Sequence, residues 1–192
     1  LIERRLAQRN MNKFSKLFTT FRYAGLTKEE TKKCLPEARK RNVTTLSWII
    51  PFMLAVVCVL LVLSFFVESE KPNMIFYLVF VCVLLAQLLL FELYFKKHND
   101  RALIMSYVFM LTAYAFGIYE ATCLGENSST ALICVFLVAV PLLFIDTPIR
   151  LTVLTLVVEG ALLLVYFLVD NPSPDRFLVI ESAGCTLLAI CY

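Results

Sequence analysis

Four glutamates stand inside long apolar stretches of this 192-residue sequence. A carboxylate inside a membrane is expensive and marks a candidate functional site. Glu159 lies about ten residues into its apolar stretch, which at about 1.5 Å per helical residue places it near the middle of a bilayer. Glu120 and Glu181 lie near one end of theirs, and Glu92 lies near the opposite end.

The position of Glu159 predicts one of two roles. It contacts a ligand or a coupling ion, or it is a protonated acid hydrogen-bonded to a nearby polar side chain. The candidate partners are the polar residues Thr155, Thr112 and Gln87. The residues alone leave both roles open.

Glu120 and Glu181 predict a second site, at the outer face. With Tyr119 they could line an outward-facing pocket for a small polar or cationic ligand. Alternatively, both acids simply reach the outer headgroups. The sequence has a single histidine, His98, and no Cys-x-x-Cys pair, Gly-rich phosphate loop or Ser-His-Asp pattern. We therefore expect no catalytic residue, no metal site and no cofactor in this chain.

The elements that carry these acids are membrane-spanning helices. Hydrophobic residues make up 60% of the chain and charged residues 17%, against about 45–50% and about 25% in soluble domains. Short connections between the apolar runs force antiparallel neighbours. The sequence predicts an all-α, six-helix, up-down transmembrane bundle over residues 44–192. Its spans are 44–67, 73–95, 102–124, 130–145, 149–169 and 177–192. The last span ends early, as expected of a piece of a longer protein.

Residues 1–43 form a basic arm that precedes the bundle. They hold 12 of the 18 Lys and Arg residues and carry a net charge of +8. Apolar residues at helical spacing over 11–21 predict an amphipathic helix, which Gly25 can end. Thr27–Glu30 has the form of a capping box, which predicts a second short helix with a kink or break near Pro36.

The distribution of basic residues predicts the orientation. With the arm in the cytoplasm, 16 Lys and Arg residues lie inside and two outside. Both ends of the chain are then cytoplasmic. The arm is expected to contact anionic lipid of the bilayer rather than nucleic acid.

The inner connection between the fourth and fifth spans has a structural pattern. Asp146 can cap a helix N-terminus, and Pro148 suits the first helical turn. Arg150 can pair with Asp146 or with a lipid phosphate. We expect these three residues to form a tight turn.

Two stretches resemble a known bacterial family. One is Phe21–Glu30 (FRYAGLTKEE), with Leu35–Glu37 and Arg39–Asn42 just before the first apolar run. The other is Phe116–Tyr119 together with Val138–Arg150 (VAVPLLFIDTPIR). In this combination the chain resembles the N-terminal membrane region of GGDEF-type diguanylate cyclases from clostridia-like bacteria. There, about six spans precede a cytoplasmic domain that makes cyclic di-GMP from GTP. The Gly-Gly-Asp/Glu-Glu-Phe motif itself is absent from this sequence.

The resemblance implies an input region in the bacterial plasma membrane. Such a region would act as a homodimer, sense a small ligand in the membrane or at its outer face, and relay the signal to a cytoplasmic output domain outside this chain. It implies an enzyme only for a longer parent protein, because no catalytic residue carries over. Three hypotheses stay open beside it: a small transporter or channel using Glu159 as a proton or cation relay, the membrane region of another receptor such as a histidine kinase, and a structural anchor.

Overall fold

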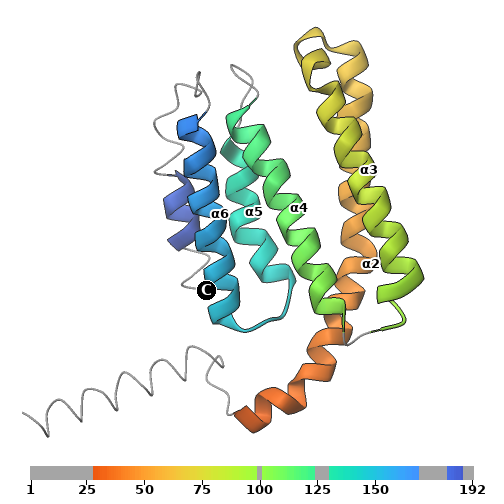
Figure 1. The fold of residues 1–192 in the computed structure, drawn as a ribbon, viewed down its shortest axis with the longest axis vertical. Coiled ribbons are helices and arrows are strands. Elements are labelled where there is room, and N and C mark those ends of the chain that lie inside the picture. Colours follow the sequence, from red (N-terminus) through yellow and green to blue (C-terminus); the bar gives the residue numbers. More distant parts are fainter. Residues whose placement is uncertain (1–27, 99–100, 124–129, 169–180, 188–192) are drawn as a thin grey trace, which may run out of the picture.

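Helices account for all the regular secondary structure in the described part of the chain. The computed structural model describes residues 28–98, 101–123, 130–168 and 181–187 (Figure 1). Successive helices run in opposite directions. The all-helical class predicted from the continuous apolar runs is confirmed. The predicted helix over 11–21 lies outside the described residues.

The first helix, α2 (Lys28–Phe66), is continuous for 39 residues although it contains Pro36 and Pro51. A proline removes one backbone hydrogen bond and crowds the preceding turn. In lipid, however, helix is the conformation that pairs every other backbone group within the segment. Figure 1 shows the first turns of α2 bent away from the rest of the helix. Helix α2 therefore bends but is not interrupted. The second short helix expected in the arm is the first part of α2 and continues into the first apolar run.

Helix α3 (Met74–Leu90) returns beside α2. A 3-10 helix, Glu68–Asn73, makes the turn between them. A π-helical turn, Phe91–Phe95, extends α3, and the Lys96 N–H donates to the Phe91 carbonyl at 2.9 Å. Glu92, the acid expected near the inner face, lies in this π-helical turn. Its Oε2 forms an ion pair with Lys96 Nζ at 2.7 Å.

Helix α4 (Ala102–Thr122) lies at the centre of the bundle. Half of its most apolar window is buried, against 28% or less in the other long apolar helices. It packs against α2 and the π-helical turn on one side and against α5 and α6 on the other. Small buried residues allow this close packing, because they let neighbouring backbones approach. They are Ala102, Ser106, Ala113, Gly117 and Ala121.

Helices α5 (Thr130–Leu143) and α6 (Pro148–Leu168) continue the up-down order. The short helix at 181–187, called the terminal helix below, lies beside α6 (Figure 1). Helices α4 and α5 approach closely at Gly117. A Cβ atom built there would lie 3.0 Å from Ile133 Cδ1 and 3.3 Å from the Ile133 Cα.

Replacing Gly117 by alanine is expected to lower the free energy of unfolding by about 1–3 kcal/mol, because the added methyl group overpacks the contact with α5. The Ile133 backbone cannot move aside as a side-chain end can. Gly160→Ala is the matched control, since nothing lies within 4 Å of a Cβ at that helical position. It should be neutral or stabilising by up to about 1 kcal/mol. Denaturation in detergent micelles measures both, and equal stability of the two variants would contradict the close contact.

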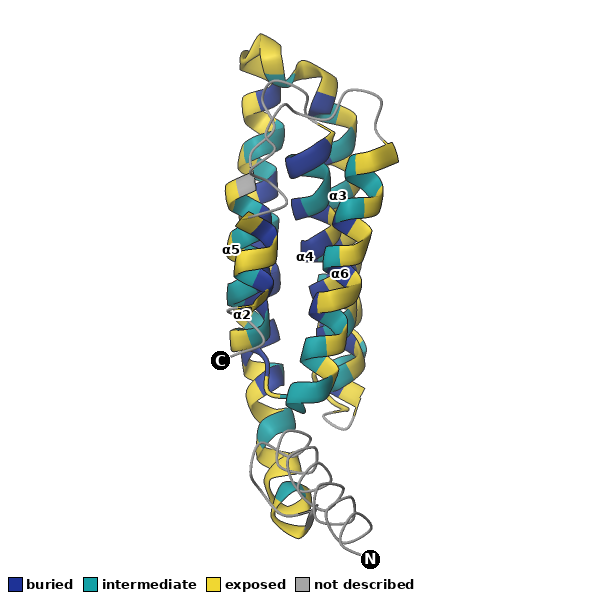
Figure 2. Ribbon diagram, turned by 90° about the vertical axis from the view of Figure 1, so that its left-hand side faces the viewer, coloured by how far each residue is buried: buried dark blue, intermediate teal, exposed yellow. Residues whose placement is uncertain are grey.

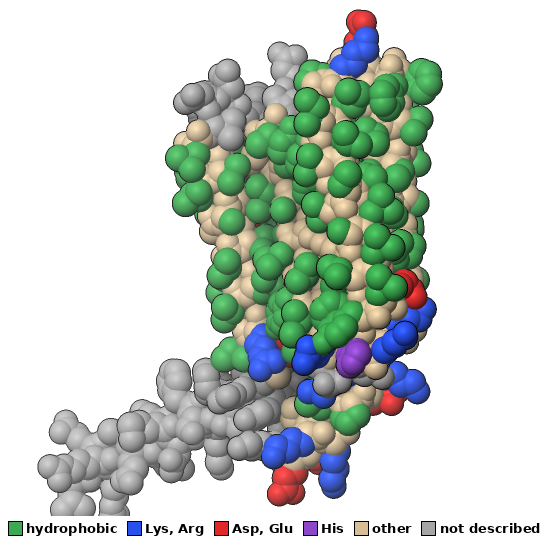
Figure 3. Space-filling view, turned by 45° about the vertical axis from the view of Figure 1, so that its right-hand side comes forward, with side chains coloured by type: hydrophobic (Ala, Val, Ile, Leu, Met, Phe, Trp, Pro, Cys, Tyr) green, Lys and Arg blue, Asp and Glu red, His purple; other side chains and the backbone are tan. Residues whose placement is uncertain are grey.

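The surface of the bundle is that of a membrane protein. Four helical stretches are long and apolar enough to cross a bilayer: Glu29–Phe66, Glu68–Phe95, Ala102–Thr122 and Pro148–Leu168. Buried residues face the interior, whereas the outward faces carry exposed apolar side chains (Figure 2). Lys and Arg gather at the end where α2 begins (Figure 3). This apolar surface fits contact with lipid.

Candidate functional site

Glu159 is joined by two hydrogen bonds to the terminal helix. Ser182 Oγ donates to Glu159 Oε1 at 2.8 Å, and Thr186 Oγ1 donates to Oε2 at 3.2 Å. Ser182 and Thr186 are four residues apart and therefore share one face of their helix. Both are buried. The carboxyl group thus uses both oxygens to hold the terminal helix against α6.

Glu159 lies midway along α6. Glu159 lies eleven residues after Pro148, the first residue of α6, so it is about 16 Å along the helix at about 1.5 Å per residue. A hydroxyl both donates and accepts hydrogen bonds. The two hydroxyls can therefore hold the acid in either protonation state, since one hydroxyl only has to reverse its bond.

The polar side chains expected to partner Glu159 have other partners. Thr155 Oγ1 donates to the Leu151 carbonyl of its own helix at 2.9 Å. Gln87 Nε2 donates to Thr112 Oγ1 at 2.5 Å and joins α3 to α4. The partners of Glu159 come instead from the last apolar run. Ser182 and Thr186 are four residues apart there, and this spacing of two hydroxyl residues was the feature of the sequence that could have identified them.

Two thiols lie beside the Glu159 contact. Cys134 on α5 faces Cys185 on the terminal helix within hydrogen-bonding reach, and both are free thiols. Glu159 and Glu181 act electrostatically on Cys134. Helices α5 and α6 and the terminal helix therefore meet at this point. Within the described residues, no three His, Cys, Asp or Glu side chains gather as a metal site.

Glu120 belongs to a different cluster, at the opposite end of the bundle from the basic residues. Tyr77 donates its hydroxyl to Glu70 Oε2 at 3.0 Å, and Asn73 Nδ2 donates to the same oxygen at 3.1 Å. The Tyr77 hydroxyl also lies within hydrogen-bonding reach of Glu120. Among the residues that the structure describes, the buried Glu120 Oε1 has no hydrogen-bond partner. Glu70, Asn73 and Tyr77 were not predicted as site residues; their signal in the sequence is three polar residues on one face where α3 begins.

Tyr119 is part of the α3–α4 packing. Its ring stacks on Phe76 with centroids 3.4 Å apart and an interplanar angle of 15°. Phe116, which is also on α4, stacks on Phe76 as well, with ring centroids 5.7 Å apart. This stack fixes the position of Glu120, the next residue along α4.

Glu120 and Glu181 lie in separate parts of the bundle. Glu120 faces α3, whereas Glu181 is the first described residue of the terminal helix and is exposed. In Figure 1 α5 and α6 lie between α4 and the terminal helix. The structure thus places Glu120 in the cluster with Tyr77, and Glu181 on the helix that contacts Glu159.

Asp146 organises the turn before α6. Its Oδ1 accepts the Thr147 N–H at 2.7 Å and Arg150 Nη1 at 3.4 Å, and its Oδ2 accepts the Tyr107 hydroxyl from α4. Pro148 is the first residue of α6. The Asp146 side chain is almost fully buried. The three turn residues thus act structurally, and Tyr107 is the partner that the sequence did not identify.

Asn42 joins the other side of this turn to α2. Its Nδ2 donates to the Ile145 carbonyl at 3.0 Å, and its Oδ1 accepts the Ile145 N–H at 2.8 Å. Asn42 is only 1% exposed. We call this pair the Asn42 latch. In the sequence Asn42 is the last polar residue of the basic stretch Arg39–Asn42, where it looks like part of a solvated flank.

The function of the chain has to be argued from this geometry. No family model, curated protein or solved structure matches the chain.

Proposed function

We propose that the chain is the membrane-embedded input region of a signalling protein, resembling that of a diguanylate cyclase, and that it relays a signal through its last helix to a cytoplasmic output domain. The observation that carries this proposal is the double hydrogen bond from Ser182 and Thr186 to Glu159. A carboxyl group is expensive at this depth. Its two oxygens hold the helix that leads toward the C-terminal end of the chain.

In this proposal the bundle has six spans. The 14-residue α5 and the terminal helix belong to two further spans beside the four long apolar stretches. The alternating direction of successive helices supports this topology (Figure 1). The gathering of Lys and Arg at one end supports a cytoplasmic location for both termini in a bacterial plasma membrane.

The relay needs two positions of the terminal helix. In one it is docked on Glu159, and in the other it has shifted or rotated away. A ligand that binds one position better moves the population toward it. Helix shifts of this kind are an established means of switching. In a homodimer the shift changes how two attached output domains meet.

The cluster of Glu70, Tyr77 and Glu120 is the proposed point of input. Glu120 Oε1 is buried and has no partner within the described residues, and Glu70 and Tyr77 lie beside it. Two carboxyl groups and one phenol suit a small cationic or polar ligand that can donate hydrogen bonds. This ligand would reach α4, which contacts α6 and hence the helix that carries Glu159.

The Glu159→Leu substitution tests the proposal in the full-length protein that carries this region. Leucine is similar in size and removes both hydrogen-bond acceptors, whereas glutamine could keep both bonds because a hydroxyl also accepts. We expect cellular cyclic di-GMP, measured by mass spectrometry, to change about fivefold or more, the lower range of allosteric coupling. Glu92→Leu is the matched control, because Glu92 is exposed and pairs with Lys96. Equal levels in the two variants, or a coding sequence that continues into no output domain, would contradict the proposal.

The second candidate function is a proton or cation relay at Glu159. The observation in its favour is that two hydroxyls lie against a carboxyl group midway along a membrane helix. It predicts proton flux in liposomes carrying the wild-type chain, reported by an internal pH-sensitive dye. It also predicts loss of the flux in Glu159→Gln and retention in Glu92→Gln. Flux with this dependence would replace the signalling proposal.

A further inference from the structure

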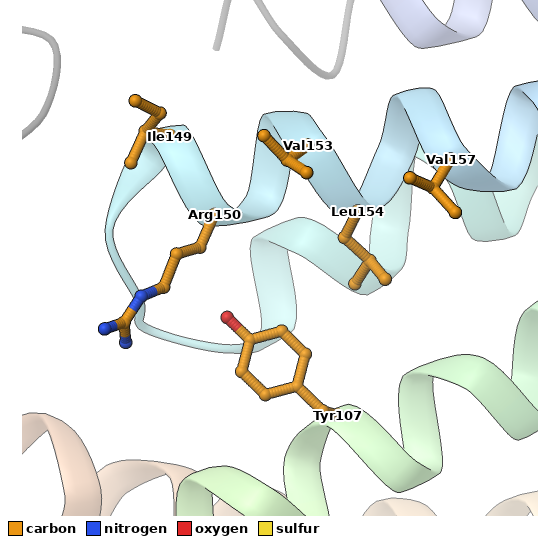
Figure 4. A pocket seen from close by; sticks show the side chains of 6 residues that line it. All are labelled: Tyr107, Ile149, Arg150, Val153, Leu154 and Val157. Atoms are coloured by element: carbon orange, nitrogen blue, oxygen red, sulfur yellow. The ribbon is translucent and has the colours of Figure 1, made fainter.

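A groove runs along α6 at the basic end of the bundle, where α4 approaches it. The cavity measures about 380 Å³ and is lined by Tyr107, Ile149, Arg150, Val153, Leu154 and Val157. Figure 4 shows Val153, Leu154 and Val157 following one another along α6, with the Tyr107 ring below them and Arg150 at one end. Val153 and Val157 are more than half exposed. The groove is therefore apolar and lies on the surface that faces lipid. The Arg150 guanidinium group lies at one end of it (Figure 4).

The length of the groove matches one leaflet of a bilayer. From Ile149 to Val157 the helix advances eight residues, or about 12 Å at about 1.5 Å per residue. Half of the hydrocarbon core of a bilayer is about 15 Å thick. The groove thus begins at headgroup level and runs over most of one leaflet, which suits an acyl chain better than a compact solute.

The charge at the groove entrance suits a phosphate. Arg150 is 58% exposed, and its contact with Asp146 uses Nη1 at 3.4 Å. A guanidinium has five N–H donors and can bind a phosphate with two parallel hydrogen bonds. Lys and Arg side chains gather at this end of the bundle (Figure 3). They add attraction for an anionic headgroup over a zwitterionic one.

The walls of the groove are held in place from within the protein. Tyr107 donates its hydroxyl to Asp146, which also pairs with Arg150. The Tyr107 ring and the Arg150 guanidinium group are thus both held in position by the Asp146 carboxylate. A site held ready in this way loses less conformational freedom on binding.

We propose that this groove binds one anionic phospholipid, with an acyl chain along Val153, Leu154 and Val157 and the phosphate at Arg150. The proposal is independent of the signalling function, because it concerns only the face between α4 and α6. It makes the lipid a specific ligand of the bundle.

The test compares phosphatidylglycerol with phosphatidylcholine of the same acyl chains, added to the purified chain in detergent micelles. Native mass spectrometry counts the bound lipids. We expect the first phosphatidylglycerol to bind about fivefold or more tightly than phosphatidylcholine, and Arg150→Gln to remove that preference. Val153→Trp, which fills the groove, should weaken binding of both lipids.

Two matched variants serve as controls. Lys97→Gln removes an exposed cation at the same end, and Val135→Trp changes an equally exposed valine on α5. Both should bind lipid as the wild type does. Equal affinity for the two lipids, or equal loss in Arg150→Gln and Lys97→Gln, would overturn the proposal. A dimer that dissociates in Val153→Trp without change in bound lipid would also overturn it, by assigning the groove to a second copy of the chain.

Discussion

Replacing Asn42 by alanine is expected to lower the free energy of unfolding by about 2–4 kcal/mol. The substitution leaves the Ile145 N–H and carbonyl, both bound by Asn42 in the folded chain, without partners. Each buried group left unsatisfied costs roughly 1–3 kcal/mol. The loss is large because a single side chain bonds both backbone groups of one residue, Ile145.

The measurement is denaturation of the purified variants in detergent micelles. Asn42→Asp should fall between the wild type and Asn42→Ala, because it keeps the acceptor for the Ile145 N–H and loses the donor. Thr44→Ala is the control, since Thr44 is exposed and its hydroxyl bonds its own helix at Lys40. If Asn42→Ala were as stable as Thr44→Ala, the latch would contribute nothing to the fold.

Removing both hydroxyls from the terminal helix, in the double variant Ser182→Ala/Thr186→Val, is expected to release it from α6. Each hydrogen bond to Glu159 stabilises docking by about 0.5–1.5 kcal/mol, so the pair is worth about 1–3 kcal/mol. The undocked population should then rise about 5- to 150-fold. The Glu159 carboxyl group is left in an apolar environment and adds to the loss.

Alkylation of Cys185 by N-ethylmaleimide in proteoliposomes reports this release. The Cys185 thiol faces Cys134 in the docked position, so its labelling rate should rise with the undocked population. Peptide mass spectrometry follows the rate, with Cys58 on α2 as the internal reference. Ser64→Ala is the control, because Ser64 is buried and bonds the Leu61 carbonyl of its own helix. An unchanged Cys185 rate in the double variant would show that the hydroxyls do not hold the helix.

The helices could be predicted from the sequence because their apolar runs are continuous and a segment in lipid has to pair its own backbone groups. The start of α6 was readable from Asp146 and Pro148, whose roles are local. Pro36 was read as a kink or break, and it bends α2 without ending it. A proline alone does not end the helix here, because the backbone groups on both sides of it still have to be paired.

The neighbours of each polar side chain could not be predicted in the same way. A membrane helix is apolar on all sides, so its sequence does not mark the face that packs inward. Glu159 could be identified as important, but its partners Ser182 and Thr186 could not be chosen over Thr155. Tyr119 was expected to face a ligand, and its ring stacks on Phe76 instead. Asn42 was missed because its partner is a backbone unit, which every residue has.

The Asn42 latch also has a consequence for the order of assembly. Asn42 and Ile145 are 103 residues apart in the sequence. At about 5–20 residues per second, a ribosome reaches Ile145 about 5–20 s after it has made Asn42. Helices α2, α3 and α4 are therefore synthesised, and can insert, before the partner of Asn42 exists. The junction between the basic flank and the bundle forms only after α5 has been made, so the Asn42 latch can close only once α2, α3, α4 and α5 are all present.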